Sequence, residues 1–257
     1  MFIFKNSFSS NVKQQYKLDH FFLMSVITIF LVCDTTAFRM TPFMGSVVPV
    51  SGLILPIVFA LGDMVADVYG YSISRKMMIW NTVICQVLFG LTIRFALSFS
   101  SPQGNTINYH YEVAFNNILW TNFTSCLSIT SGMFVNAFLM SKLKVRMHGK
   151  HFLFRTIMSS SISEFVLCFV AYNILYFWTK NFGEIWSIII AVWWYKVIFA
   201  ILASPIVWFV SKTVKYYEGI DKLDIGINYN PFRYIDENQE IYISAANDSA
   251  FNASERH

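Results

Sequence analysis

The chain has 257 residues, of which 55% are hydrophobic, 18% are aromatic and only 13% are charged, against about a quarter charged in an ordinary soluble domain. A water-soluble fold of this length cannot hide that much apolar surface, so the composition excludes a soluble protein. Residues 1–215 carry a charge balance of +9 and residues 216–257 one of −5, which indicates basic membrane loops rather than a nucleic-acid partner.

Six apolar segments are long enough to cross a bilayer, which needs about 20 residues. They are 18–38, 47–68, 77–98, 113–140, 153–178 and 185–210. Their lengths predict an all-α, polytopic membrane protein with six transmembrane helices, and not a β-barrel. In the second segment Pro49, Gly52, Pro56 and Gly62 would interrupt a regular helix. Broken helices are tolerated at membrane depth mainly where they line a protein cavity.

The connections between the segments alternate in charge, which predicts the orientation because Lys and Arg concentrate in cytoplasmic loops. The basic connections hold Lys5, Lys13, Lys17, Arg75, Lys76, Lys142, Lys144, Arg146, Lys150, Arg155, Lys212 and Lys215. The alternate loops hold Arg39 and Lys180. Both termini are therefore expected in the cytoplasm. The predicted organisation is an N-terminal segment (1–17), a membrane domain (18–215) and a mostly flexible acidic tail (216–257), with a polar outer loop at 100–112.

Five charged residues lie well inside the apolar segments, and Arg94 lies near the outer end of the third. Asp63 and Asp67 are one helical turn apart near the end of the second segment, and Asp34, Glu164 and Lys196 lie in the first, fifth and sixth. A charge in hydrocarbon costs several kcal/mol unless it is paired or solvated, so such groups usually face a cavity. Two other readings are an acidic helix end at the water interface and ion pairs that only hold the bundle together.

Amide and hydroxyl side chains accompany these charges among many aromatic residues. Flat rings stack on Phe, Tyr or Trp, while carboxylates and amides bind the edge of a ring, so this combination suits a planar, polar, uncharged ligand. The histidines and cysteines show no metal-ligand spacing, and glycine-rich phosphate loops are absent. The sequence therefore predicts no cofactor and no bound metal.

Several motifs, taken in chain order, resemble the signature of the queuosine precursor transporter family. The members of that family are vitamin-uptake-like integral membrane proteins. They are residues 62–71 (GDMVADVYGY) with Arg75 and Trp80, 136–144 (NAFLMSKLK), Gly149 with Lys150 and Arg155, 159–164 (SSSISE), Tyr195 with Lys196 and Pro205, and 228–232 (NYNPF). The resemblance covers about residues 34–232. Two positions depart from the family pattern: Asp67 stands where Glu is common, and Leu167 stands where an Asp often follows the fifth-segment motif.

The resemblance implies a transporter of the bacterial cytoplasmic (inner) membrane. Its expected substrate is a 7-deazaguanine precursor of the tRNA nucleoside queuosine, either the cyano or aminomethyl base or queuine. Glu164 or Asp63 would accept hydrogen bonds from the ring. Lys196 would donate a hydrogen bond to the substrate or neutralise a negative charge, and Trp80 or Trp193 would stack on the ring. Together with the polar residues of the segments, the resemblance predicts as substrate-binding residues Asp34, Asp63, Asp67, Trp80, Asn136, Arg155, Glu164, Trp193 and Lys196.

Two further functions compete with transport. Asp63 and Asp67 could share a divalent cation in a membrane enzyme, although the residues that follow supply no further acid. The chain could also be a non-transporting scaffold whose polar residues lock helix packing. Proton coupling through the membrane acids and a homo-oligomeric state are both left open.

Overall fold

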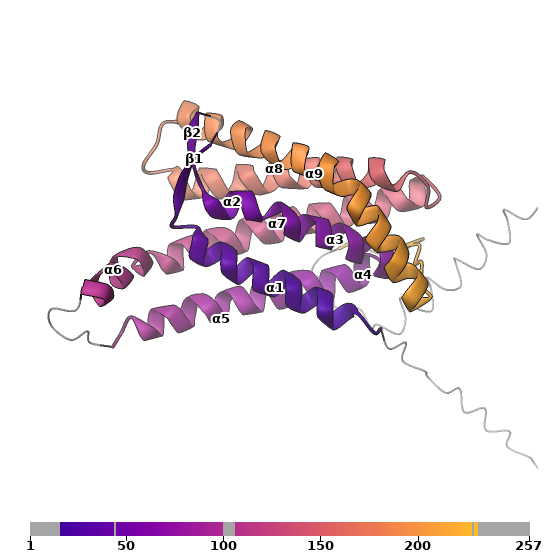
Figure 1. Cartoon of the computed structure of the whole chain (residues 1–257), viewed down its shortest axis with the longest axis horizontal. Coiled ribbons are helices and arrows are strands. Elements are labelled where there is room, and N and C mark those ends of the chain that lie inside the picture. Colours follow the sequence, from indigo (N-terminus) through magenta and orange to yellow (C-terminus); the bar gives the residue numbers. More distant parts are fainter. Residues whose placement is uncertain (1–15, 44, 100–105, 228, 231–257) are drawn as a thin grey trace, which may run out of the picture.

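Long helices account for most of the protein (Figure 1), in a computed structural model that describes residues 16–43, 45–99, 106–227 and 229–230. Apolar runs fold as helices in hydrocarbon because a helix satisfies its backbone N–H and C=O groups internally. The elements are α1 (Asp19–Thr36), β1 (Met40–Phe43), β2 (Ser46–Pro49), α2 (Val50–Ile54), α3 (Pro56–Tyr69), α4 (Tyr71–Ile73), the π-helix η1 (Ser74–Trp80), α5 (Asn81–Ala96), α6 (Thr106–Phe115), α7 (Ile118–Arg146), α8 (Phe152–Tyr176) and α9 (Phe182–Glu218).

Among the described residues, five helical stretches are long and apolar enough to cross a membrane. They are Asp19–Thr36, Val50–Tyr69, Thr106–Arg146, Phe152–Tyr176 and Phe182–Glu218. The remaining expected segment, 77–98, contains the end of η1 and α5, whose apolar part Thr82–Ala96 is shorter. The sixth crossing therefore stays a prediction. Large apolar side chains on the outside suit contact with lipid; on α9, Leu202, Ile206 and Phe209 are 70%, 67% and 66% exposed.

The second apolar segment contains two helices, α2 and α3, with Leu55 alone between them. Pro56 is at the start of α3, where its missing N–H removes no hydrogen bond from the helix. Leu55 keeps helical dihedral angles (φ −56°, ψ −32°), so α3 follows directly on α2 (Figure 1). A functional break at this point stays a prediction.

The expectation of an all-α fold needs one correction, at the end of the bundle where α1 ends. There β1 and β2 form an antiparallel hairpin, with Met40 opposite Pro49 and Phe43 opposite Ser46. The predicted outer loop also differs, because α6 begins at Thr106, inside residues 100–112. Residues 100–105 of that loop lie outside the described part of the chain.

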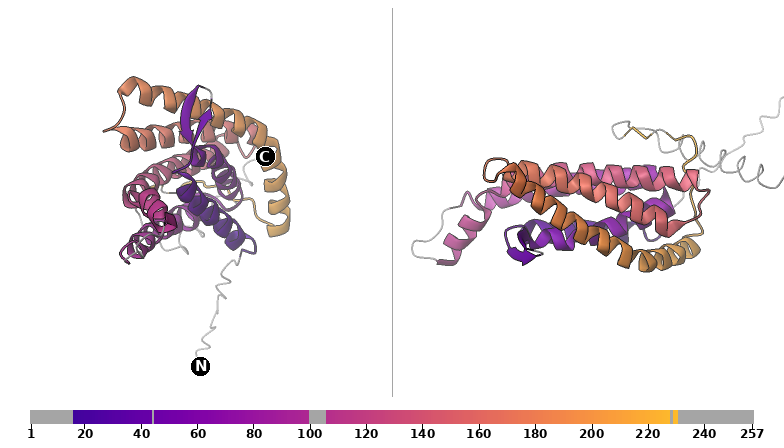
Figure 2. Two further views of the ribbon diagram at one scale, coloured as in Figure 1. Left: turned by 60° about the vertical axis from the view of Figure 1, so that its left-hand side comes forward. Right: turned by 90° about the horizontal axis from the view of Figure 1, so that it is seen from above.

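Helices α7, α8 and α9 pack in sequence, and α3 packs against α7 and α9. Helices α1 and α5 pack on each other and on α7, and the last turns of α9 lie near the start of α1 (Figure 2). Pro205 lies inside α9, and α9 bends in its second half in Figure 1. A proline inside a helix removes a backbone hydrogen bond and bends the axis. The bend brings the last turns of α9 to the end of α3.

Both ends of the described chain lie at the same end of the bundle (Figure 1). There the backbone N–H of Leu18 donates to Glu218 Oε1 over 2.7 Å. This arrangement agrees with an even number of crossings, while the side of the membrane stays a prediction. Most of the predicted N-terminal segment and tail, and part of the motif at 228–232, lie outside the described residues. The flexibility of the tail is therefore also still a prediction.

Candidate functional site

One face of α3 carries Phe59, Asp63 and Asp67 at four-residue spacing, which places them on the same side of the helix. Asp63 is completely buried. Its Oδ1 accepts a hydrogen bond from Asn136 Nδ2 of α7 over 2.8 Å. Its Oδ2 accepts one from Ser160 Oγ of α8 over 2.7 Å. Amide and hydroxyl groups from two neighbouring helices thus solvate this carboxylate inside the bundle.

A buried ion pair joins α8 to α9 beside the same face of α3. Lys196 Nζ lies 2.6 Å from Glu164 Oε2, and both side chains are at most 2% exposed. The ammonium also lies over the Phe59 ring, 5.9 Å from its centroid, where the ring face attracts a cation. The predicted residues Glu164 and Lys196 are therefore brought together, and α3 contributes the aromatic face beside them.

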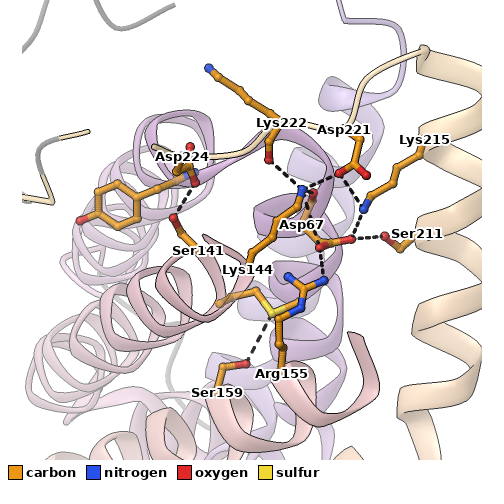
Figure 3. A network of polar contacts seen from close by, with 12 residues as sticks. Asp67, Ser141, Lys144, Arg155, Ser159, Ser211, Lys215, Asp221, Lys222 and Asp224 are labelled. Carbon is orange, nitrogen blue, oxygen red and sulfur yellow. Dashed lines mark hydrogen bonds and ion pairs between the residues drawn. The ribbon is translucent and has the colours of Figure 1, made fainter. Parts of the chain in front are cut away.

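Asp67 lies at the end of α3 among cations (Figure 3). Arg155 Nη2 of α8 is 2.9 Å from Oδ1, and Lys215 Nζ of α9 is 2.6 Å from Oδ2. Ser211 Oγ also donates to Oδ2 over 2.9 Å. Ser211 and Lys215 reach Asp67 because they follow the bend at Pro205. One carboxylate therefore ties α3 to α8 and α9.

The chain after α9 covers this cluster. We call residues 219–227 together with 229–230 the strap. Lys144 Nζ of α7 donates to the Asp67 backbone oxygen, to Asp221 Oδ1 and to the Lys222 backbone oxygen, over 2.5, 2.5 and 2.7 Å (Figure 3). Lys144 therefore joins α7 both to the end of α3 and to the strap.

Asp224 fastens the strap to the bundle. Its Oδ2 accepts from Ser141 Oγ over 2.6 Å and from the Tyr71 backbone N–H over 2.8 Å. Burial raises the pKa of the Asp224 carboxyl above its ordinary value, although these two hydrogen bonds oppose the rise. Gly70 has a φ of +82°, and a Cβ there would lie 2.6 Å from Asp224 Oδ1. Glycine is thus needed both for the backbone conformation and for the approach of the strap.

Asp34 belongs to a separate buried cluster on α1, α5 and α7. Asn122 Nδ2 donates to Asp34 Oδ2 over 3.2 Å and to Gln86 Oε1 over 2.9 Å. Asn122 and Asn136 are 14 residues apart on α7, which is about 21 Å along a helix. The predicted acids are therefore distributed over two separate regions of the bundle.

Gly90 makes room for this second cluster. A Cβ at Gly90 would lie 2.6 Å from Oδ1 and 2.8 Å from Cγ of Asn122. We expect Gly90→Ala to displace the Asn122 amide from Asp34 and Gln86, and to lower the melting temperature of the detergent-purified protein. Gly183→Ala is the matched control, because a Cβ there meets nothing within 4 Å. Equal melting temperatures for the two variants would contradict this contact.

The two predicted tryptophans, Trp80 and Trp193, contact residues other than the buried charged groups. Trp80 packs edge-on against Phe134 of α7, with ring centroids 6.1 Å apart. Trp193 donates from Nε1 to the Ser161 backbone oxygen over 2.8 Å and packs edge-on against Phe165. Both rings are therefore held against the helices that carry the partners of Asp63.

The structure gives Asp63 and Asp67 different sets of partners. Asp63 turns to the neutral groups Asn136 and Ser160, whereas Asp67 is already bound by positively charged side chains. Within the described part of the chain, no group of three or more His, Cys, Asp or Glu is placed to hold a metal ion.

The predicted substrate-binding residues do not include several that the structure brings to these clusters. These are Gln86, Asn122, Ser141, Lys144, Ser211, Lys215, Asp221 and Asp224, although the sequence places Gln86 and Asn122 among the polar side chains of the segments. Lys144 and Lys215 lie in the basic connections of the sequence, and Ser141 and Ser211 lie just beyond the predicted segments. Their spacing of three or four residues (141 with 144, 211 with 215) places each pair on one helix face, which is the signal that could have indicated them.

A protein-family model with the description "Putative vitamin uptake transporter" matches residues 49–210. The match includes α3, α7, α8 and the part of α9 that carries Lys196, and therefore the surroundings of Asp63 and the Glu164–Lys196 pair. No curated protein and no solved structure matches the chain.

Proposed function

The chain belongs to this family of vitamin uptake transporters and is an integral, multi-pass membrane protein. On this basis we propose that it imports a 7-deazaguanine base for tRNA queuosine synthesis. The cyano base, the aminomethyl base and queuine are the candidate substrates. The proposed location is the bacterial cytoplasmic membrane.

The observation that carries the proposal is the buried charge within the bundle. Glu164 and Lys196 form an ion pair, and Asp63 lies among amide and hydroxyl groups. Charged groups are expensive at membrane depth and mark substrate or ion pathways there. A protein that only needed rigid helix packing could use apolar side chains of similar volume, which are often as stabilising as a buried ion pair.

The chemistry of a deazaguanine fits these groups. Ring and exocyclic N–H donors lie along one edge, which a carboxylate accepts in paired, charge-assisted hydrogen bonds. The ring carbonyl accepts from an ammonium or an amide. Asp63 or Glu164 would accept from the donor edge, Lys196 would donate to the carbonyl, and Phe59 offers a ring face beside Lys196. Binding would exchange the present internal hydrogen bonds for bonds to the substrate.

Uptake of labelled queuine and of the two precursor bases tests this function, in cells that lack their own transporter. Asp63→Asn and Glu164→Gln keep the shape of each side chain and remove its charge. We expect each to lower the initial rate about tenfold or more, since a hydrogen bond to a charged group contributes about 1.5–3 kcal/mol.

Glu184→Gln is the matched control, because Glu184 lies in a surface pair with Lys180 and its side chain is 57% exposed. If both test variants take up the bases at the wild-type rate, neither Asp63 nor Glu164 takes part in transport. Absence of uptake by the wild-type chain for all three bases would overturn the proposed substrate.

Energy coupling is a separate part of the proposal. The buried acids could carry protons, and proton-coupled uptake would stop when a protonophore is added to the reconstituted protein. An unchanged initial rate would instead favour facilitated diffusion followed by trapping of the base in tRNA.

A further inference from the structure

The cluster around Asp34 differs from the one around Asp63 in how many of its polar atoms are satisfied. Both carboxylate oxygens of Asp63 accept hydrogen bonds, and Asn136 Oδ1 accepts from Ser163 Oγ over 3.2 Å. Near Asp34, by contrast, Gln86 Nε2 and Thr82 Oγ1 are buried and make no hydrogen bond to the described residues. A buried polar group without a partner costs about 1–3 kcal/mol. Such groups are expected where a ligand completes the bonds.

The two unpartnered groups near Asp34 lie on one helix. Thr82, Gln86 and Gly90 follow one another at four-residue spacing along α5, so they share a face of the helix. That face meets Asn122 of α7 through Gly90 and Gln86, and Asn122 joins it to Asp34 of α1. Thr82, Gln86 and Asp34 are each at most 2% exposed. Three helices thus converge on a carboxylate acceptor, an amide donor and a hydroxyl.

We propose that Asp34, Thr82, Gln86 and Asn122 form a second recognition site, which binds a neutral ligand whose N–H donor stands next to a carbonyl acceptor. The lactam edge of a guanine-type ring has this pattern. Asp34 would accept from the ring N–H groups, and the Gln86 amide would donate to the carbonyl. The Thr82 hydroxyl would take part with either group.

This site deepens the proposed function, on which the choice of a guanine-type ring rests. Asn122 lies about 21 Å along α7 from Asn136, and Asp34 lies near the end of α1 that leads to the β1–β2 hairpin. A substrate that enters at that end would meet the Asp34 site first and the Asp63 cluster second. The alternation of donors and acceptors at Asp34 would select the base before it reaches the buried ion pair.

The test is ligand binding to the full-length, detergent-purified protein, measured by the rise in melting temperature and by titration. The probes are guanine, 7-deazaguanine, queuine and adenine, because adenine has the opposite donor and acceptor order on the same edge. We expect the lactam bases to stabilise the wild-type protein and adenine to have little effect, since a ligand that binds only the folded state raises its stability.

Three variants locate the binding. Asp34→Asn should weaken binding of the lactam bases about tenfold or more, and Thr82→Val should weaken it severalfold. Thr92→Val is the matched control on the same helix, since Thr92 is exposed and its hydroxyl is bonded to the Leu88 backbone oxygen. Thr82→Val changes few atoms, so it keeps the test valid if Asp34→Asn fails to fold.

The outcomes separate this inference from the proposed function. If the wild-type protein binds the bases and both test variants bind equally well, the Asp34 site is overturned while the transport proposal stands. If lactams bind through Asp34 but no 7-deazaguanine is taken up by cells, the site stands and the proposed substrate fails. If no lactam stabilises the wild-type protein, the Asp34 site is overturned.

Discussion

Replacing Asp67 with alanine is expected to lower the free energy of unfolding by about 3–5 kcal/mol, the usual effect of removing one partner from a buried ion pair. Asp67 is 1% exposed and lies 2.9 Å from Arg155, 2.6 Å from Lys215 and 3.9 Å from Lys144. Without the carboxylate, Asp221 would still contact Lys144 and Lys215, but the buried Arg155 guanidinium would lose its ion-pair partner. Two guanidinium nitrogens of Arg155, Nε and Nη1, make no hydrogen bond within the described part of the chain, so the arginine has little alternative support.

The measurement is the melting temperature in detergent, or resistance to a denaturing detergent, for Asp67→Ala beside Glu184→Ala. Glu184 also pairs with a lysine, at 3.8 Å, but both side chains are partly exposed. Removing such a surface pair costs less than about 1 kcal/mol. An Asp67→Ala protein as stable as the Glu184→Ala protein would mean that water or lipid head groups solvate the cation cluster.

The sequence predicted the ionisable residues inside the apolar segments, and Asn136 and Arg155 among their partners, but not Ser211, Lys215 or Lys144. A charge inside an apolar run is visible in the sequence because it breaks the run, so Asp34, Asp63, Asp67, Glu164 and Lys196 were found. Of the partners of Asp67, Lys144 is 77 residues away along the chain and Ser211 is 144 residues away. Such pairs depend on how helices pack, and a single sequence does not contain that information.

Helix ends were the second limit. Apolar runs predicted segments ending at 140 and 210, but α7 continues to Arg146 and α9 to Glu218. The polar turns at these ends are helical because the backbone hydrogen bonds continue past the apolar part. Lys144 and Lys215 therefore looked like loop charges, although they lie on helices that face Asp67.

The hairpin was missed for a different reason. Pro42 and Pro49 fall within β1 and β2, and proline normally argues against a strand because it cannot donate to a ladder. A two-stranded hairpin has two edges, where proline is tolerated. The strands therefore formed without a sequence pattern that distinguishes them from a loop.

The second large effect is expected at the ion pair between α8 and α9. Glu164→Gln leaves the Lys196 ammonium unpaired in the bundle, and Lys196→Met leaves the carboxylate unpaired. Each change should lower the free energy of unfolding by about 3–5 kcal/mol, because the remaining charge is no longer compensated. The pair is 2.6 Å apart, and the side chains are 1% and 2% exposed, so neither charge has water to replace its partner.

The double variant Glu164→Gln with Lys196→Met separates structure from transport. It leaves no uncompensated charge, and replacing a whole buried pair is often neutral or stabilising. We therefore expect its melting temperature to return close to that of the wild-type protein, while uptake of the 7-deazaguanine bases stays at least about tenfold reduced, as for loss of a charge-assisted bond.

Uptake at the wild-type rate in the stable double variant would show that the pair only holds α8 against α9. A double variant that is no more stable than the single ones would show instead that the surroundings of the pair require charge. That requirement would follow if Phe59, whose ring lies 5.9 Å from Lys196 Nζ, contributes a cation–π interaction that methionine cannot replace. Measuring stability and uptake on the same preparations distinguishes a charge pair kept for the substrate from one kept for packing.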